Sequence, residues 1–327
     1  MGNLHKTPLF VAFGFDDNGI SGFANSGDVG ATGGMTFVLD MLKSHRDLQG
    51  NPLKASFFLA SNYILQNNVD DPFLVKQTWQ RAYEEGHEIG NHTRTHSHGN
   101  GFTVDKWKAE MKACNNDLTS SFVGIGISKD NIVGFRTPFL EYNDAAFEAA
   151  QSLGFVYDCS IEEGFLPNQD GTNFPWPYVL SSRGLDLWEL PVYAVIVPPD
   201  EECKKYGVEP GMRAKMKERQ DYFDVCDGKI TGFDYNLWVL FKMTKAEFVA
   251  TLKYSLDLRL KGNRAPFMLG GHTDIYSSAY LGEIPNATAS ERQDALNDFL
   301  DHALGKPEVQ VVSFKNVLDW VRNPITG

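Results

Sequence analysis

The stretch PLFVAFGF, residues 8–15, is the feature from which the fold is first predicted. Its apolar residues run almost unbroken, which is typical of a strand that is buried on both faces of a parallel sheet. An amphipathic segment follows at 33–45 and a second apolar run at 53–60. The chain therefore begins as strand, helix, strand, which is the opening unit of a parallel α/β fold.

The same alternation continues along most of the chain. We expect further strands at 87–91, 131–136, 155–160, 265–272 and 309–314, and helices at 71–86, 103–118, 142–154, 244–260, 288–304 and 313–323. Between about 160 and 240 the rhythm breaks into a region rich in Gly, Pro and aromatic residues, with a charged part in which no strand is evident. The sequence predicts one α/β domain over residues 1–327: a distorted parallel (β/α) barrel with a loop-rich insertion near 160–240.

Composition excludes several classes of partner. The 327 residues include 30 basic and 42 acidic side chains, a net charge of −12, which argues against nucleic acid and anionic membranes as partners. No apolar run reaches the length of a membrane span, and the first ten residues lack the pattern of a signal peptide. Nothing in the sequence indicates a protein partner.

The cysteines and the glycosylation patterns leave questions open. Four cysteines without a CxxC pair argue against a cysteine metal site, whereas bridges Cys203–Cys226 and Cys114–Cys159 both remain open. The sequence matches the N-glycosylation pattern at Asn91 and Asn286. A glycan on Asn91 would block the histidine motif beside it, so only Asn286 is kept as a candidate.

Polar residues recur where the predicted strands end. In a parallel α/β barrel these ends meet on one rim, and the chemistry gathers there. The residues at such positions are Asp16, Asp17, His92, His96, Arg136, Asp158 and His272. They come from five predicted strands, so their convergence is the main argument for an active site.

Asp16, Asp17, His92 and His96 together suggest a metal site with a nearby base. Two imidazoles four positions apart share one face if the loop forms a helical turn, and one carboxylate would complete a site with open positions. Adjacent carboxylates in different surroundings can divide the roles of ligand and base. The alternatives are an Asx turn for the aspartates and a plain polar loop for the histidines. His98 is interpreted as a surface residue.

The remaining candidates also have simpler interpretations. Arg136 ends an apolar strand and would find its best partner in a carboxylate, although a surface salt bridge would explain it too. His272 follows two glycines and would otherwise be a hydrogen-bonded residue of the rim. Tyr142, Trp176 and Tyr178 lie in loop-like sequence and suit a sugar face, yet aromatic residues are more often core.

Five motifs in this order resemble those of the polysaccharide deacetylases, carbohydrate esterase family 4. They are FGFDD at 13–17, HTRTH at 92–96, FRTPF at 135–139, YDCS at 157–160 and LGGH at 269–272. The segments WPY, WKAEM and VLDWVRNP look more like the chitin deacetylases of insects. The resemblance runs from about residue 8 to the C-terminus and is weakest between 195 and 240.

The resemblance implies a role for each matching residue. Asp17, His92 and His96 would bind a divalent metal, zinc or another such as Co²⁺. Asp16 would be the general base, oriented by Arg136. The other implied roles are the oxyanion-binding backbone N–H for Phe139, the general acid for His272, and the residue that orients this histidine for Asp158.

Three departures from the family pattern concern packing and the acyl pocket. Gly14 stands where the family has Thr. The family places a Leu two residues before the last His, where this chain has Gly270, with Leu269 one position earlier as the candidate lining residue. The fourth motif, DCSIEE, has no aromatic residue, and we expect Trp176 to substitute for it.

The resemblance implies a zinc-dependent hydrolase that removes N-acetyl groups from chitin or its oligosaccharides, a glycan of N-acetylglucosamine, outside the cell or in the periplasm. Two alternatives stay open. One is a deacetylase of another acylated glycan, such as peptidoglycan or acetylxylan. The other is a carbohydrate-binding protein without catalysis on the same scaffold. A glycosidase is the least favoured, since it would not need the two histidines.

Overall fold

The computed structural model describes residues 7–23 and 32–324, except for the side chains of 224–226. The strands in this part are β1 (Leu9–Asp17), β2 (Ser56–Leu59), β3 (Glu88–Asn91), β4 (Gly134–Phe135), β5 (Tyr157–Asp158), β6 (Glu162–Glu163), β7 (Tyr178–Val179), β8 (Trp188–Glu189), β9 (Val192–Ile196), β10 (Lys229–Thr231), β11 (Phe267–His272) and β12 (Val309–Val311). The α-helices in this part are α1 (Gly34–Ser44), α2 (Pro72–Glu84), α3 (Val104–Thr119), α4 (Asp144–Ser152), α5 (Asp200–Cys203), α6 (Met212–Arg219), α7 (Lys245–Lys261), α8 (Ala289–Leu304) and α9 (Phe314–Arg322).

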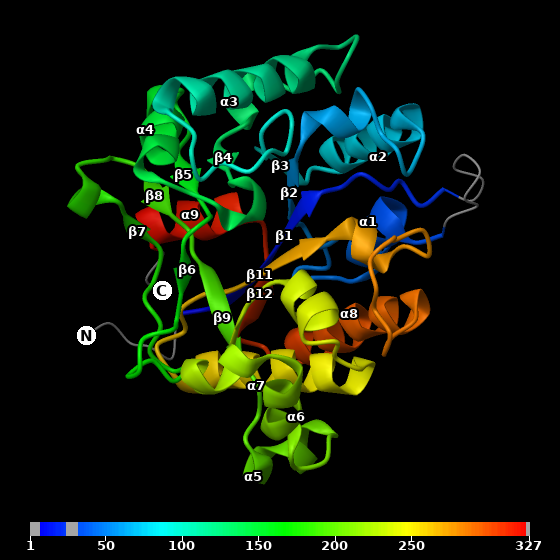
Figure 1. The fold of residues 1–327 in the computed structure, drawn as a ribbon, viewed down its shortest axis with the longest axis vertical. Helices are drawn as coiled ribbons and strands as arrows, with labels where there is room; N and C mark the ends of the chain where they lie inside the picture. The colour runs from blue at the N-terminus through cyan, green and yellow to red at the C-terminus, as the bar shows by residue number, and fades with distance from the viewer. Residues whose placement is uncertain (1–6, 24–31, 325–327) are drawn as a thin grey trace.

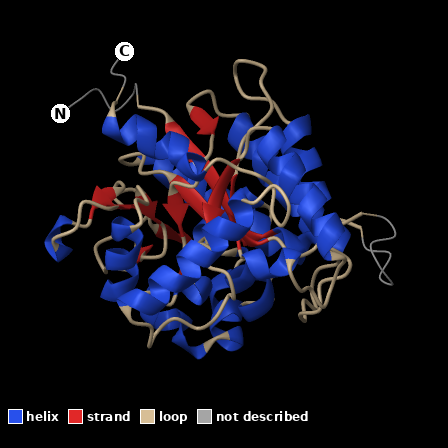
Figure 2. Cartoon of the chain, turned by 90° about the horizontal axis from the view of Figure 1, so that it is seen from above, coloured by secondary structure: helices blue, strands red, loops and turns tan. Residues whose placement is uncertain are grey.

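The main sheet is curled and almost entirely parallel. Its strand order is β11-β1-β2-β3-β4-β5-β8-β7, with β12 also pairing β1 and only the β7–β8 pair antiparallel. The strands lie at the centre and the helices surround them (Figures 1 and 2). This is the predicted distorted parallel barrel.

The region near 160–240 contains more regular structure than predicted. β8 extends the main sheet beside β5, and a second sheet has the order β10-β9-β6. A parallel bridge between Phe233 and Gly270 ties the segment after β10 to β11. The short helices α5 and α6 project below α7 (Figure 1). The region was interpreted as loops because most of its strands span only two or three residues, too short to show periodicity.

The side chains of β1 alternate between two apolar clusters. Leu9, Val11, Phe13 and Phe15 belong to the cluster under the outer helices, whereas Phe10 and Ala12 belong to the cluster on the inner face of the curled sheet. Successive strand residues point to opposite faces. Residue 16 therefore continues the inner series.

The last helix, α9, packs against the inner face and is anchored there. Phe314, Val317 and Leu318 belong to the inner cluster. The carboxylate of Glu88, buried on β3, accepts hydrogen bonds from the backbone N–H of Lys315 (2.9 Å) and from the hydroxyl groups of Ser56 and Tyr157. A carboxylate at a helix N-terminus is stabilising, so Glu88 fixes α9 to the sheet.

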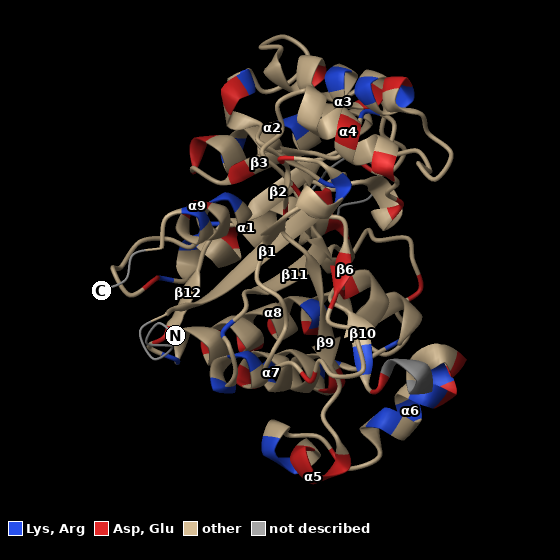
Figure 3. Cartoon of the chain, turned by 90° about the vertical axis from the view of Figure 1, so that its left-hand side faces the viewer, with Lys and Arg blue, Asp and Glu red and all other residues tan. Residues whose placement is uncertain are grey.

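Several smaller predictions are also tested here. Asp71 caps α2 by accepting from the N–H of Phe73. Cys114, Cys159 and Cys203 are free, buried thiols, so neither bridge is formed. Of the two possible glycosylation sites, Asn91 is buried and its side chain donates a hydrogen bond to α3, whereas Asn286 is exposed. Among the described residues no helix is long and apolar enough to cross a bilayer, and charged side chains gather on the outer helices (Figure 3).

Candidate metal centre and active site

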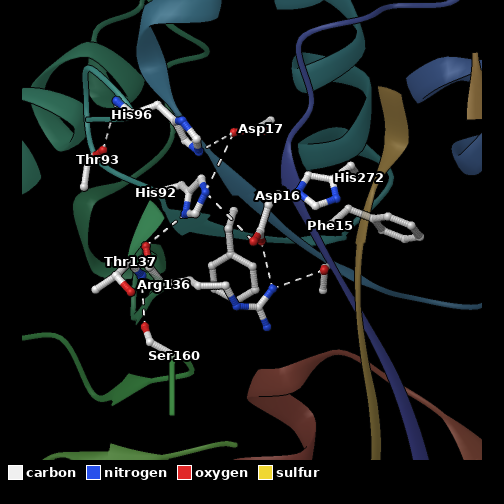
Figure 4. Close-up of polar contacts among 12 residues, drawn as sticks. Phe15, Asp16, Asp17, His92, Thr93, His96, Arg136, Thr137, Ser160 and His272 are labelled. Carbon is white, nitrogen blue, oxygen red and sulfur yellow. Dashed lines mark hydrogen bonds and ion pairs between the residues drawn. The ribbon is translucent and has the colours of Figure 1, made fainter. Parts of the chain in front are cut away.

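Asp17, His92 and His96 lie together at the carboxyl ends of β1 and β3 (Figure 4). Asp17 Oδ1 is 3.0 Å from His96 Nε2 and 3.8 Å from His92 Nε2. His92 Nδ1 lies 2.9 Å from the carbonyl oxygen of Arg136, which can only accept, so Nδ1 carries the proton and Nε2 presents a lone pair. Burial, followed by the nearby His96, lowers the pKa of His92 well below its usual value and favours the neutral ligand form.

A divalent metal fits this group of atoms. Asp17 Oδ1 is buried and accepts no hydrogen bond from the described residues, although two imidazole nitrogens surround it. A buried carboxylate oxygen without a donor is costly, and a cation removes that cost. Two histidines and one carboxylate form a donor set that leaves positions open, as catalytic zinc requires.

Left-handed backbone at the strand ends brings the ligands together. Strict alternation would turn Asp17 away from Asp16, but Asp17 has φ 63°, which turns the chain so that both carboxylates reach the site. Thr93 and His96 also have positive φ, at 66° and 51°. The histidines are therefore joined by an irregular loop, and the helical turn considered from their spacing is not formed.

Asp16 is held by a buried arginine. Arg136 Nη1 donates to Asp16 Oδ1 at 2.8 Å, and Nε donates to the carbonyl of Cys159 at 2.9 Å. The guanidinium also lies over the rings of Phe58, Phe233 and Phe314. Burial raises the pKa of Asp16 to about 6, against the opposing effects of Arg136 and His272. A carboxylate with such a pKa is suited to accept a proton near neutral pH.

His272 faces the site from β11 and is held by Asp234. Its Nδ1 lies 2.9 Å from Asp234 Oδ1, and its backbone N–H donates to Asp234 Oδ2 at 2.8 Å. Burial disfavours the charged imidazolium, but the buried Asp234 carboxylate outweighs it, and the pKa of His272 rises to about 9. With Nδ1 occupied by Asp234, Nε2 is the nitrogen that can give a proton to a ligand.

These groups line a cavity of about 520 Å³. Asp16, Asp17, His92, His96 and His272 belong to its polar part. The rest of the wall comes from the segments after β1, β2, β4, β10 and β11 and includes Phe139 and Phe233. A cavity with a possible metal site and titratable groups with shifted pKa values on its wall is the default place to look for catalysis.

A family model described as polysaccharide deacetylase matches residues 11–157. Over 296 residues the chain is 24% identical to chitin deacetylase 1 of Bombyx mori, covering 85% of this chain and 46% of that one. Over 118 residues it is 30% identical to a peptidoglycan-N-acetylglucosamine deacetylase of Bacillus cereus, covering 36% and 46%. The chain thus spans less than half the length of either relative.

A solved structure supports the same fold. A Mycobacterium smegmatis protein provisionally named a polysaccharide deacetylase superposes with a TM-score of 0.56 at 18% identity, covering 97% of this chain and 91% of that one. Over residues 11–157 the chain matches a polysaccharide deacetylase domain. At this identity the structural likeness supports the fold alone. The range matched by the family model includes the aspartate pair, both candidate histidine ligands and Arg136.

In this polysaccharide deacetylase domain the role predicted for Asp158 is not the one seen. The prediction that Asp158 orients His272 is wrong, because Asp234 takes that place. Tyr157 points inward on β5, so its neighbour Asp158 points to the opposite face. There Asp158 accepts from the N–H and hydroxyl of Ser160 and lies beside the buried Glu189 on β8. Burial raises the pKa of Asp158 to about 6.

The predicted substrate-binding aromatics do not line the cavity. Tyr142 packs against α4, and Tyr178 donates its hydroxyl to Glu163 at 2.9 Å. Trp176 packs on Trp320 of α9 and donates to the carbonyl of Asn263. These rings are half-buried and pack against the core, which agrees with the simpler interpretation of them as packing residues.

Leu269 does not line the cavity either, contrary to the prediction. It is buried in the cluster under the outer helices, because alternation along β11 turns it away from the inner face. The inner position belongs to Gly270, where an added Cβ would lie 2.2 Å from the ring of Phe233. Phe233 lines the cavity and lies 5.4 Å from the His272 ring, so it fills the space where the family places a leucine.

Phe139 lies beside the candidate metal ligand His96, and its backbone is strained. Its φ is 57° and that of Leu140 is 54°, a left-handed pair that costs free energy without glycine. His98 stacks on the Phe139 ring at 4.1 Å and contacts Glu141 at 3.0 Å. His98 is exposed, as predicted, and in addition it contacts the loop that carries Phe139. The oxyanion role of the Phe139 N–H stays a prediction.

Other residues in or beside the cavity were missed by the sequence reasoning. Asp234, Tyr235 and Asn236 follow β10, in a region interpreted as lacking strands. Recognition of the strand KIT at 229–231 would have placed Asp234 just past a strand end. Asp274 follows β11, and burial, with Asp17 nearby, raises its pKa to about 7.

Gly14 in this deacetylase domain is explained by packing. A Cβ at this position would lie 2.8 Å from Phe314 Cζ and 3.1 Å from both terminal nitrogens of Arg136. We therefore expect Gly14→Thr, although it restores the family residue, to lower the free energy of unfolding by about 1–3 kcal/mol through overpacking. Urea unfolding measures this. Gly101→Thr is the control, because a Cβ there meets nothing within 4 Å; equal effects of the two changes would contradict this packing explanation.

Proposed function

We propose that this protein is a zinc-dependent hydrolase that removes N-acetyl groups from chitin or chitin oligosaccharides, giving acetate and a free amino sugar. The observation that carries the proposal is the placement of two supported proton-transfer groups beside one metal-ligand group. Asp16 with Arg136 and His272 with Asp234 both adjoin Asp17, His92 and His96 in one cavity.

In this proposal Asp17 Oδ1 and the Nε2 atoms of His92 and His96 hold the metal. A divalent metal bound there supplies Lewis-acid polarisation of the amide carbonyl and lowers the pKa of the attacking water. The neutral state of His92 and the orphaned oxygen of Asp17 support this assignment.

The proton transfers are assigned to the two carboxylate-supported groups. The free oxygen of Asp16 accepts the proton of the attacking water, while Arg136 keeps the carboxylate aimed and ionised. The protonated His272 gives its Nε2 proton to the leaving nitrogen as the C–N bond breaks, since an amine cannot leave as an anion. The backbone N–H of Phe139 is assigned to the oxyanion.

The choice of chitin rests on the relatives. Two matches that cover 85% and 98% of this chain are to proteins named chitin deacetylase, and this favours an N-acetylglucosamine polymer. The match to a peptidoglycan-N-acetylglucosamine deacetylase, at higher identity over a shorter stretch, favours peptidoglycan as the second candidate substrate. Both polymers lie outside the cytosol, so the proposal includes action in the periplasm or outside the cell.

Acetate release tests the proposal directly. We expect the protein to release acetate from N-acetylglucosamine oligomers, to lose this activity after chelation, and to regain it with Zn²⁺. Loss on chelation follows from the ligand role of Asp17, His92 and His96. Glycan binding without acetate release in any metal state would instead favour a binding protein, and activity on peptidoglycan alone would favour the second substrate.

A further inference from the structure

The cavity is far larger than an acetyl group needs. Its volume is about 520 Å³, whereas a water takes up roughly 30 Å³ in the liquid and an acetyl group has only three such heavy atoms. The space beyond the metal-ligand group must therefore receive a further part of the substrate, and its lining indicates the chemistry of that part.

The lining beyond the catalytic groups is mainly apolar. Six aliphatic side chains contribute to it: Ile20, Val69, Leu140, Leu240, Ile275 and Leu281. Aliphatic side chains offer no partner to a sugar hydroxyl, and burying a hydroxyl without a partner is unfavourable. Such a wall favours an alkyl or aromatic group.

Outside the catalytic groups, the side chains of this wall that could hydrogen-bond a sugar hydroxyl are those of Tyr63, Tyr235, Asn236, Asp274 and Tyr280. Asp274 is already engaged, because its two oxygens accept from the backbone N–H groups of Gly19 (3.2 Å) and Ile20 (2.9 Å). Apart from the charged groups and the tyrosine hydroxyls, Asn236 is the polar side chain that remains in the lining. A pocket built for a hydroxylated ring would present more such groups.

The rim of the cavity exposes apolar surface. Leu281 is 82% exposed, Phe139 53% and Tyr235 42%, and all three line the cavity. Exposed apolar patches mark binding sites, whereas single scattered residues do not. Their concentration at one opening is independent of the polar shortage inside it.

The wall that carries Leu281 is held in place by a buried arginine. Arg292 donates from Nε to the carbonyl of Ile275 (2.6 Å), from Nη1 to that of Ala287 (2.6 Å) and from Nη2 to that of Ser277 (3.2 Å). These bonds fix both ends of the 275–287 segment. The apolar wall is thus preformed, which lowers the ordering cost of binding.

We propose that the cavity binds an apolar group on the amide substrate, an alkyl chain or an aromatic ring larger than acetyl. This inference rests on the proposed function, because it places that group beside the same metal-ligand group. The apolar group can belong to the acyl side of the amide or to the amine side, and the experiment separates these sources.

Two matched ligand series test the inference with the zinc-loaded full chain. One series varies the acyl group of glucosamine from acetyl to butanoyl to octanoyl. The other keeps N-acetylglucosamine and varies its glycoside from methyl to butyl to hexyl. Calorimetry gives Kd for each compound below its aggregation limit, and acetate or fatty-acid release is the second readout. We expect at least a tenfold gain in affinity along one series.

Two variants locate the effect. Leu281→Asp is expected to remove the gain, whereas Leu48→Asp, at a leucine that is 61% exposed outside the cavity, is expected to keep it. A gain below twofold in both series, or a gain that survives Leu281→Asp, would overturn the inference. Acetate release without any chain-length gain would remove the inference and leave the proposed function. A gain in affinity without hydrolysis of any compound would do the reverse.

Discussion

Asp16→Asn is expected to lower kcat for acetate release by about a thousandfold, within the range of general base catalysis, while the zinc content stays unchanged. Asn matches Asp in shape and its amide oxygen can still accept from Arg136, so the local geometry should persist. The amide cannot take a proton from water. Asp16 is also not one of the three residues whose possible ligand atoms lie close together, which are Asp17, His92 and His96.

The zinc measurement is what makes this experiment informative. Asp17→Asn, one residue away, is expected to lose zinc and activity together, because Asp17 Oδ1 is the proposed ligand. Metal content by atomic absorption and turnover on the same samples separate the two roles. Full activity of Asp16→Asn with unchanged zinc would remove Asp16 as the base.

Asp234→Asn is expected to lower kcat by roughly 10²- to 10⁴-fold and to shift the basic limb of the pH–rate profile downward. A general acid works only while protonated, so activity that depends on His272 persists below its pKa and is lost as pH rises through about 9. Without the Asp234 carboxylate, burial would dominate and the pKa of His272 would fall. The loss of activity would then begin at lower pH.

Asp158→Asn is a matched control for this change. Asp158 and Asp234 are both fully buried, so the two substitutions disturb the interior in similar ways. Asp158 contacts Ser160 and lies beside Glu189, away from His272. The substitution Asp158→Asn is therefore expected to leave the basic limb of the pH–rate profile unchanged. A basic limb that moves in Asp158→Asn and stays in Asp234→Asn would reverse the correction made from the structure.

The parts of the site that follow from sequence are those governed by long strands. β1 has nine residues, so its apolar run and the aspartates at its end are visible in the sequence. For Arg136 the residues alone predicted only a carboxylate partner, since a buried charge requires one, and the choice of Asp16 came from the family resemblance.

The parts that failed depend on contacts that no local pattern encodes. β5 spans two residues, and which of Tyr157 and Asp158 faces inward is decided by packing against the inner cluster. Asp234 reaches His272 through a bridge between Phe233 and Gly270, residues 37 positions apart in the chain. The aromatic candidates were ambiguous for a similar reason, since a ring in loop sequence can pack on α9 as readily as on a ligand.

The position of β1 in the sheet has a consequence for how the chain folds. β1 pairs with β2, but also with β11 and β12, which end at His272 and Val311. β1 is thus made long before two of its partners. High contact order slows folding, and until β11 and β12 have been made the apolar edge of β1 that they cover stays unpaired and open to aggregation. We therefore expect recombinant yield to depend on chaperones and on slow translation more than the stability of the finished fold would suggest.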